Sequence, residues 1–134
     1  MGSARKRKKT ILVAFSSSSD SCVLCEALYS EKCRLLRADN ILSLISALER
    51  HIVDMLIVDA EMPCVSMSHF LPFLRERYGE MKVIVAMKDY SAQQEVNLRT
   101  HKILYVLNWP INPGLLQSVV ERGLSMDSER AVSV

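Results

Sequence analysis

Glycine is scarce in this sequence, with four residues in a chain of 134. No glycine-rich loop of the kind that cradles phosphate groups is present, which disfavours a nucleotide-binding enzyme. Long apolar runs are lacking as well: no stretch approaches the roughly 18 to 20 apolar residues that a membrane span needs. Nor does an apolar segment of the length that a secretory signal requires follow the basic residues near the start. We therefore expect a cytoplasmic protein.

Charge is close to balance, with a formal net charge of +2, but it is unevenly distributed. The run Arg5 to Lys9 holds five of the 17 basic residues, so the rest of the sequence has 12 basic and 15 acidic residues. This run predicts a disordered basic leader over residues 1–9. Such a leader could recruit the chain to nucleic acid or an anionic membrane, because Lys and Arg attract phosphates without sequence-specific contacts. We do not expect these partners.

Four short apolar runs, at residues 11–15, 55–58, 83–87 and 103–107, have the length and continuity of strands in a parallel sheet that is covered on both faces. Residues 33–37 are predicted as a further short strand. Hydrophobic residues make up 49% of the sequence, which is ample for the core of a single domain.

Each apolar run is followed by a segment in which apolar residues recur at helical spacing. Asp20 is a plausible N-cap for the first helix, and Ser91 with Gln94 has the spacing of a capping box for the fourth. We place the domain at residues 10–125 and a polar tail at 126–134. Five strands alternating with five helices predict a doubly wound α/β domain, whose five-stranded parallel sheet is covered on both faces.

The cysteines fall within or beside apolar patterns, so we expect reduced thiols in or near the core rather than a disulfide framework. Cys22 and Cys25 have the spacing of a redox or zinc pair. No second cysteine pair and no nearby histidine completes a zinc set, so we expect no metal site.

In doubly wound folds, sites lie at the carboxyl ends of the strands. At one such place, residues 54–63 read Asp-Met-Leu-Ile-Val-Asp-Ala-Glu-Met-Pro. This segment resembles the phosphoacceptor strand and loop of the response-regulator receiver family, with Asp59 on the phosphorylated aspartate. The resemblance covers almost the whole predicted domain. It implies the flavodoxin-like fold of CheY-like receivers and a part in two-component, phosphorelay signal transduction.

The other functional positions of the resembling family are replaced. Phe15 and Ser16 stand where the family has two acidic residues that help to hold a magnesium ion. Met87 stands where it has Ser or Thr, and Trp109 where it has Lys before the proline, here Pro110. Neither a thioether nor an indole supplies the hydroxyl or ammonium contacts that a phosphoryl group needs. We therefore predict a degenerate pseudo-receiver with no catalytic residue and weak or lost binding of Mg²⁺, which requires oxygen ligands.

Two of these residues have more than one interpretation. Asp59 is either a residual phosphoacceptor or a structural carboxylate that caps the loop after its strand. Trp109 is either a packing residue or, beside Phe15, a platform for a partner. The resemblance also implies a cis Trp109-Pro110 bond.

We predict a signalling module that is not an enzyme and that binds a protein partner independently of phosphorylation, through its last helices and strand as resembling domains do. A homodimer is one form of such an interaction. The first alternative is a functional receiver phosphorylated on Asp59 in a phosphorelay. The second is a scaffold that the basic leader recruits to nucleic acid or membrane.

Overall fold

The computed structural model describes residues 8–89 and 91–132, with side chains described as far as residue 125. Five strands alternate with five helices along this part of the chain, as predicted. The strands are β1 (Lys9–Ala14), β2 (Cys33–Ala38), β3 (Met55–Asp59), β4 (Lys82–Met87) and β5 (Tyr105–Asn108). The helices are α1 (Ser18–Leu28), α2 (Ile41–Arg50), α3 (Met67–Arg77), α4 (Ala92–Arg99) and α5 (Pro113–Val132).

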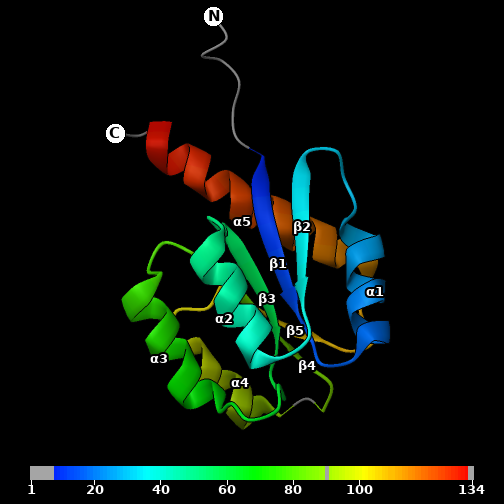
Figure 1. Cartoon of the computed structure of the whole chain (residues 1–134), viewed down its shortest axis with the longest axis vertical. Coiled ribbons are helices and arrows are strands. Elements are labelled where there is room, and N and C mark those ends of the chain that lie inside the picture. Colours follow the sequence, from blue (N-terminus) through cyan, green and yellow to red (C-terminus); the bar gives the residue numbers. More distant parts are fainter. Residues whose placement is uncertain (1–7, 90, 133–134) are drawn as a thin grey trace, which may run out of the picture.

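The strands form one parallel sheet in the order β2-β1-β3-β4-β5. In Figure 1 the helices α2, α3 and α4 lie in front of the sheet, while α5 crosses behind it with α1 beside it. Because every strand runs in the same direction, all five carboxyl ends meet at one edge, the lower one in Figure 1. The predicted doubly wound α/β fold is confirmed.

Successive residues of a strand belong to opposite faces of the sheet. Leu12 and Ala14 of β1 pack into the hydrophobic cluster under α2, α3 and α4. Ile11, Val13 and Phe15 pack into the second cluster, under α1 and α5. A strand covered on both sides needs an apolar residue at nearly every position, which explains why its sequence is a continuous apolar run.

Two predicted helix starts had different outcomes. The side chain of Ser91 accepts a hydrogen bond from the backbone N–H of Gln94 at 3.3 Å, so the predicted start of α4 is confirmed. The N-cap of α1 is Ser17, whose Oγ accepts from the N–H of Asp20 at 3.3 Å. The prediction of Asp20 as the cap was wrong, because several serines that also favour this position precede it. Asp20 lies instead in the first turn of α1, where its charge suits the helix dipole.

The ends of the chain differ from the prediction in part. Lys9 belongs to β1 and pairs with Cys33, and the leader before residue 8 lies outside the described residues. α5 continues to Val132, inside the segment predicted as a polar tail, since no glycine or proline interrupts residues 124–134. No helix among the described residues is long and apolar enough to cross a membrane.

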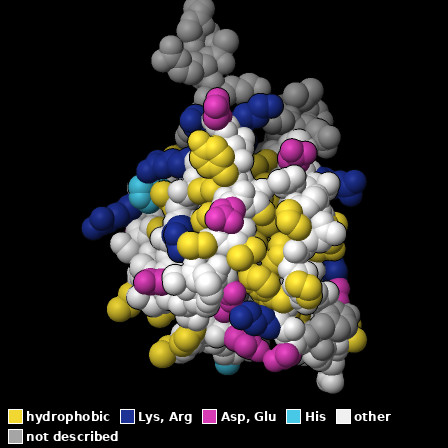
Figure 2. Space-filling view, turned by 90° about the vertical axis from the view of Figure 1, so that its right-hand side faces the viewer, with side chains coloured by type: hydrophobic (Ala, Val, Ile, Leu, Met, Phe, Trp, Pro, Cys, Tyr) yellow, Lys and Arg dark blue, Asp and Glu magenta, His cyan; other side chains and the backbone are white. Residues whose placement is uncertain are grey.

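The cysteines are less buried than expected. Cys22 and Cys64 are exposed, Cys25 and Cys33 are half-buried, and all four are free thiols. The expectation of core thiols was therefore wrong for Cys22 and Cys64. α1 directs Leu24 and other residues to the core and leaves Cys22 on its outer side. Figure 2 shows the side of the molecule that carries β2 and α1, where hydrophobic side chains lie uncovered among charged ones.

Candidate functional site

Asp59 lies at the carboxyl end of β3 and is half-buried. Its carboxylate Oδ1 accepts a hydrogen bond from the backbone N–H of Glu61 at 2.9 Å, and its carbonyl accepts from the N–H of Met62 at 3.1 Å. An aspartate that binds the backbone two residues further on stabilises a tight turn. The contact expected of a structural carboxylate that caps the loop after its strand is thus present at the end of β3.

Phe15 and Trp109 form an aromatic pair at the same edge of the sheet. Phe15 follows β1 and is completely buried, and its backbone N–H donates to the carbonyl of Ala38 at 3.1 Å. Its ring meets the Trp109 ring edge to face, with centroids 6.2 Å apart and planes at 82°. Trp109 is half-buried against the α1/α5 cluster, and its backbone N–H donates to the carbonyl of Met87 at 3.0 Å. Trp109 therefore acts at least as a packing residue.

The remaining predicted site residues lie at this edge in different environments. Ser16 and Pro110 are exposed, and the Trp109-Pro110 bond is cis, as the resemblance implies. Met87 is 3% exposed and packs into the cluster under α2, α3 and α4. Its thioether is thus part of the hydrophobic core, on the opposite face of the sheet from Phe15.

The indole Nε1 of Trp109 is buried and has no acceptor among the described residues. A buried N–H without a partner is destabilising by about 1 to 3 kcal/mol relative to a paired one. Packing against Phe15 and the α1/α5 cluster, rather than a hydrogen bond of its Nε1, therefore positions the indole among the described residues.

Lys88 is a residue of the site that sequence reasoning missed. Its Nζ lies 2.9 Å from Oδ2 of Asp20 in α1 and 5.5 Å from the centroid of the Trp109 ring. Ammonium groups over an indole face are attracted by the ring's electrons. The Lys88 side chain is 53% exposed and that of Asp20 only 14%. Lys88 follows Met87 directly, so its place at the end of β4 was the available signal.

The carboxylates around Lys88 favour its charged form. The pKa of Lys88 is raised, first by its hydrogen bond to Asp20 and the charge of that carboxylate, and further by the charges of Asp59 and Glu61. In Figure 2, acidic and basic side chains lie against one another at the lower end, where the carboxyl ends of the strands are. The edge is thus a mixed-charge surface around an aromatic pair.

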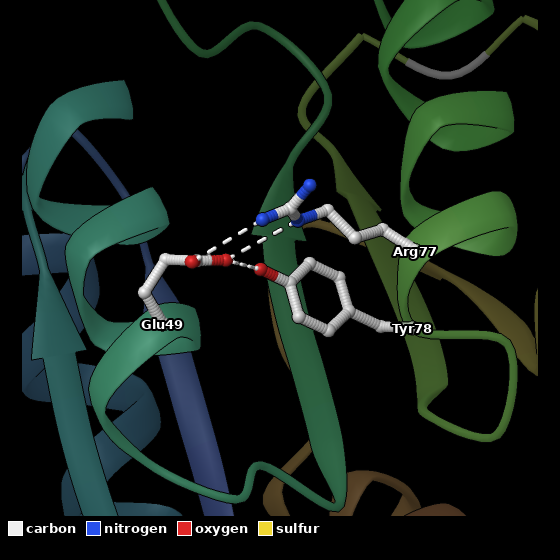
Figure 3. A network of polar contacts seen from close by, with 3 residues as sticks. All are labelled: Glu49, Arg77 and Tyr78. Carbon is white, nitrogen blue, oxygen red and sulfur yellow. Dashed lines mark hydrogen bonds and ion pairs between the residues drawn. The ribbon is translucent and has the colours of Figure 1, made fainter.

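A second polar cluster lies at the opposite, amino end of the sheet (Figure 3). Glu49 at the end of α2 accepts hydrogen bonds from Nε and Nη2 of Arg77, each at 3.3 Å, and from the hydroxyl of Tyr78. These contacts, that of Tyr78 first, lower the pKa of Glu49. The cluster links the carboxyl ends of α2 and α3, far from the aromatic pair, and acts as a structural contact.

No protein-family profile and no curated protein matches the sequence. Solved structures do resemble it. A signal receiver domain from Vibrio parahaemolyticus has a TM-score of 0.87 at 20% identity, covering 95% of this chain and 98% of that one. A response regulator from Thermotoga maritima has a TM-score of 0.81 at 19% identity, covering 89% of this chain and 99% of that one. The chemotaxis response regulator CheY4 of Vibrio cholerae has a TM-score of 0.77 at 17% identity, covering 87% of this chain and 99% of that one. The chain therefore has the flavodoxin-like fold of response-regulator receiver domains.

Proposed function

We propose that this receiver-fold chain is a signalling module that binds a protein partner without being phosphorylated, and that it catalyses no reaction. The observation that carries the proposal is Phe15, which lies completely buried against Trp109 at the end of β1. The resembling family has a metal-holding acid at this position. A phenyl ring provides no ligand for a metal, and its burial leaves no space there for one.

The other groups at the edge also fit a magnesium ion poorly. Mg²⁺ takes oxygen ligands in near-octahedral geometry and is usually held by carboxylates. Of the carboxylates here, Asp59 uses Oδ1 to accept from Glu61, and Asp20 is paired with Lys88. Among the described residues, no three His, Cys, Asp or Glu side chains are grouped to hold a metal ion. These arrangements support a site that works without Mg²⁺ and therefore without the metal-assisted phosphoryl transfer of the resembling family.

The surface formed by α4, β5 and α5 is the proposed contact with the partner. β5 is an edge strand of the sheet, and exposed strand edges with apolar neighbours favour association. Val96 of α4 is 63% exposed and Leu115 of α5 is 44% exposed, while Tyr105 of β5 is half-buried. A different protein or a second copy of this chain could use this surface, and neither would require a change at Asp59.

Binding of beryllofluoride, a phosphoryl mimic, tests the proposal in the presence of Mg²⁺. Trp109 is the sole tryptophan of the chain, and its contact with Phe15 at the edge makes its fluorescence a local reporter. We expect no saturable fluorescence change in the wild-type chain and the same flat titration in Asp59→Asn. This variant keeps the size of the side chain and an oxygen that can accept the hydrogen bond from the backbone N–H of Glu61.

The alternative is a receiver that accepts phosphate on Asp59, and one observation favours it: Asp59 is half-buried rather than enclosed, so a donor can reach it. A saturable change in the wild type that Asp59→Asn abolishes would establish this alternative and overturn the proposal. A saturable change that persists in Asp59→Asn would place an anion elsewhere and leave phosphorylation of Asp59 without support.

A further inference from the structure

β2 (Cys33–Ala38) is the edge strand of the sheet on the side away from β5, and among the described residues only β1 pairs with it. The backbone N–H of Phe15, after β1, donates to the carbonyl of Ala38 at 3.1 Å, so Ala38 directs its backbone groups toward β1. Alternate residues of an edge strand direct these groups to opposite sides, and those of Leu35 and Arg37 therefore point away from the sheet. An added strand could pair with them.

The side chains of β2 alternate between the two faces of the sheet. Leu35 packs against the α1/α5 cluster and Leu36 against the cluster under α2, α3 and α4, and both leucines are half-buried. Arg34 therefore belongs to the α2 side and Arg37 to the α1 side, where its Nη2 donates to the carbonyl of Ser18 at 3.4 Å. The edge thus presents two leucines flanked by two arginines, one arginine on each face.

The charge of this strand is entirely positive. Arg34 and Arg37 are its only charged residues and both are exposed, and within the described part of the chain neither forms an ion pair. Asp39, which follows the strand, instead accepts hydrogen bonds from the side chains of Asn40 and Ser43 at the start of α2. Carboxylates of a partner would therefore find two cations at this edge, beside the uncovered hydrophobic side chains seen from this side in Figure 2.

A second copy of this chain fits the edge less well. Two antiparallel β2 strands related by a two-fold axis can pair their outward backbone groups when the axis passes at Leu35 or at Leu36. The first register places Arg34 diagonally opposite its own copy, and the second does the same for Arg37. Diagonal neighbours are about 7 to 8 Å apart, within reach of long side chains, so each register opposes like charges. Charged residues on edge strands commonly prevent such self-pairing.

We infer that the β2 edge binds an extended acidic segment of a partner protein, which adds a strand to the sheet. The residues of the added strand that lie opposite Arg34 and Arg37 are three positions apart and on different faces of the sheet. The segment that fits has two acidic residues separated by two apolar ones, which lie beside Leu35 and Leu36. This contact is at the other edge of the sheet from the proposed surface of α4, β5 and α5, and neither contact requires the other.

A fluorescein-labelled peptide, Ser-Thr-Glu-Val-Val-Glu-Thr-Ser, tests the inference by fluorescence anisotropy. We expect saturable binding that weakens with added salt, and binding at least about fivefold weaker when lysine replaces both glutamates of the peptide. Arg34→Glu should weaken binding of the acidic peptide about fivefold, and Arg34→Glu with Arg37→Glu about 25-fold, because each attraction becomes a repulsion. The double variant should prefer the lysine peptide. Lys102→Glu is the matched control, since it changes the charge equally in the loop before β5, and it should bind as the wild type.

Two N-methylated acidic peptides test whether the segment binds as a strand. One carries methyl groups on alternate backbone nitrogens and the other on the remaining ones. Only alternate N–H groups of an added strand face β2, so one peptide should lose binding and the other should keep it. Circular dichroism confirms folding of the variants, and Arg34→Gln replaces Arg34→Glu if the latter does not fold.

Three results would overturn the inference: equal binding of the acidic and lysine peptides by the wild type, equal binding of the acidic peptide by Arg34→Glu and Lys102→Glu, or equal behaviour of the two methylated peptides. A wild-type dimer in sedimentation whose dissociation constant changes in Arg34→Glu but not in Lys102→Glu would assign the edge to a second copy, and would overturn it as well.

Discussion

Arg75 of α3 offers a quantitative test of how the loops are held. Its guanidinium donates four hydrogen bonds to backbone carbonyls of two different loops. In the α3–β4 loop it reaches Gly79 at 3.2 Å and Met81 at 2.8 Å. In the α4–β5 loop it reaches His101 at 3.3 Å and Lys102 at 3.0 Å. Replacing Arg75 by Met keeps much of the side-chain length and a good helix former while removing all four donors.

The size of the effect follows from the burial of the four bonds. The bonds to Met81 and His101 are partly buried, whereas those to Gly79 and Lys102 are exposed and water can replace them. Each partly buried bond is worth about 1 kcal/mol net. Lys102 also has a φ of 60°, a left-handed conformation that side chains disfavour, so the turn depends on such contacts. We expect Arg75→Met to lower the free energy of unfolding by about 2 kcal/mol.

Urea unfolding followed by circular dichroism measures this loss. With a slope of about 1 to 3 kcal/mol per molar urea, the midpoint of Arg75→Met should fall by about 1 M. Arg77→Met is the matched control, because Arg77 lies on the same helix but its contact with Glu49 is on the surface. Its midpoint should stay near that of the wild type. Equal midpoints for the two variants would refute the conclusion that the hydrogen bonds of Arg75 hold the two loops.

Two further predictions concern the polar cluster around Glu49 and a helix cap. Because the folded state lowers the pKa of Glu49, its contacts stabilise the chain above the ordinary pKa of glutamate, and this stability is lost as the pH falls through the lowered value. Thermal unfolding should therefore show Glu49→Gln less stable than the wild type at neutral pH, with a difference that shrinks in acid; a difference independent of pH would contradict this. Ser91→Ala should lower the free energy of unfolding by about 1 kcal/mol in urea, since it removes the cap of α4. Ser66→Ala should lower the free energy of unfolding by less, because the Oγ of the N-cap Ser66 bonds the Oγ of Ser68 and makes no capping bond to the backbone of α3, and equal losses would count against the capping argument.

The inner strands β1, β3 and β4 could be predicted because they are buried on both faces, and such burial requires an apolar residue at nearly every position of the strand. The start of β5 shows the limit of this signal. The apolar run begins at Ile103, whereas β5 begins at Tyr105. Ile103 and Leu104 are apolar because they pack against the two clusters, and they do so before the ladder with β4 begins. Apolar character reports burial, and burial extends beyond the hydrogen-bonded strand.

The candidate site was predictable only where a position in the fold decides the contact. Phe15 and Trp109 follow the carboxyl ends of β1 and β5, which lie at the same edge of the sheet, so their place at one edge could be expected from topology although β3 and β4 separate the two strands. The pairing of Lys88 with Asp20 could not, because a long flexible side chain can point in many directions, and the choice depends on all charges around it. The cap of α1 was missed for a similar reason, since four consecutive serines offer nearly equal local preferences and the packing of α1 selects Ser17.

The alternation of neighbouring residues between the two hydrophobic clusters restricts how this chain can change in evolution. One residue inserted into β1 would move Leu12 and Ala14 to the α1/α5 side and send Val13 to the other, so both clusters would have to be rebuilt at once. Changes of length should therefore accumulate in loops rather than in strands. Among those loops, the segments that Lys88 joins are the least free, because a longer loop there would separate the ammonium from Asp20.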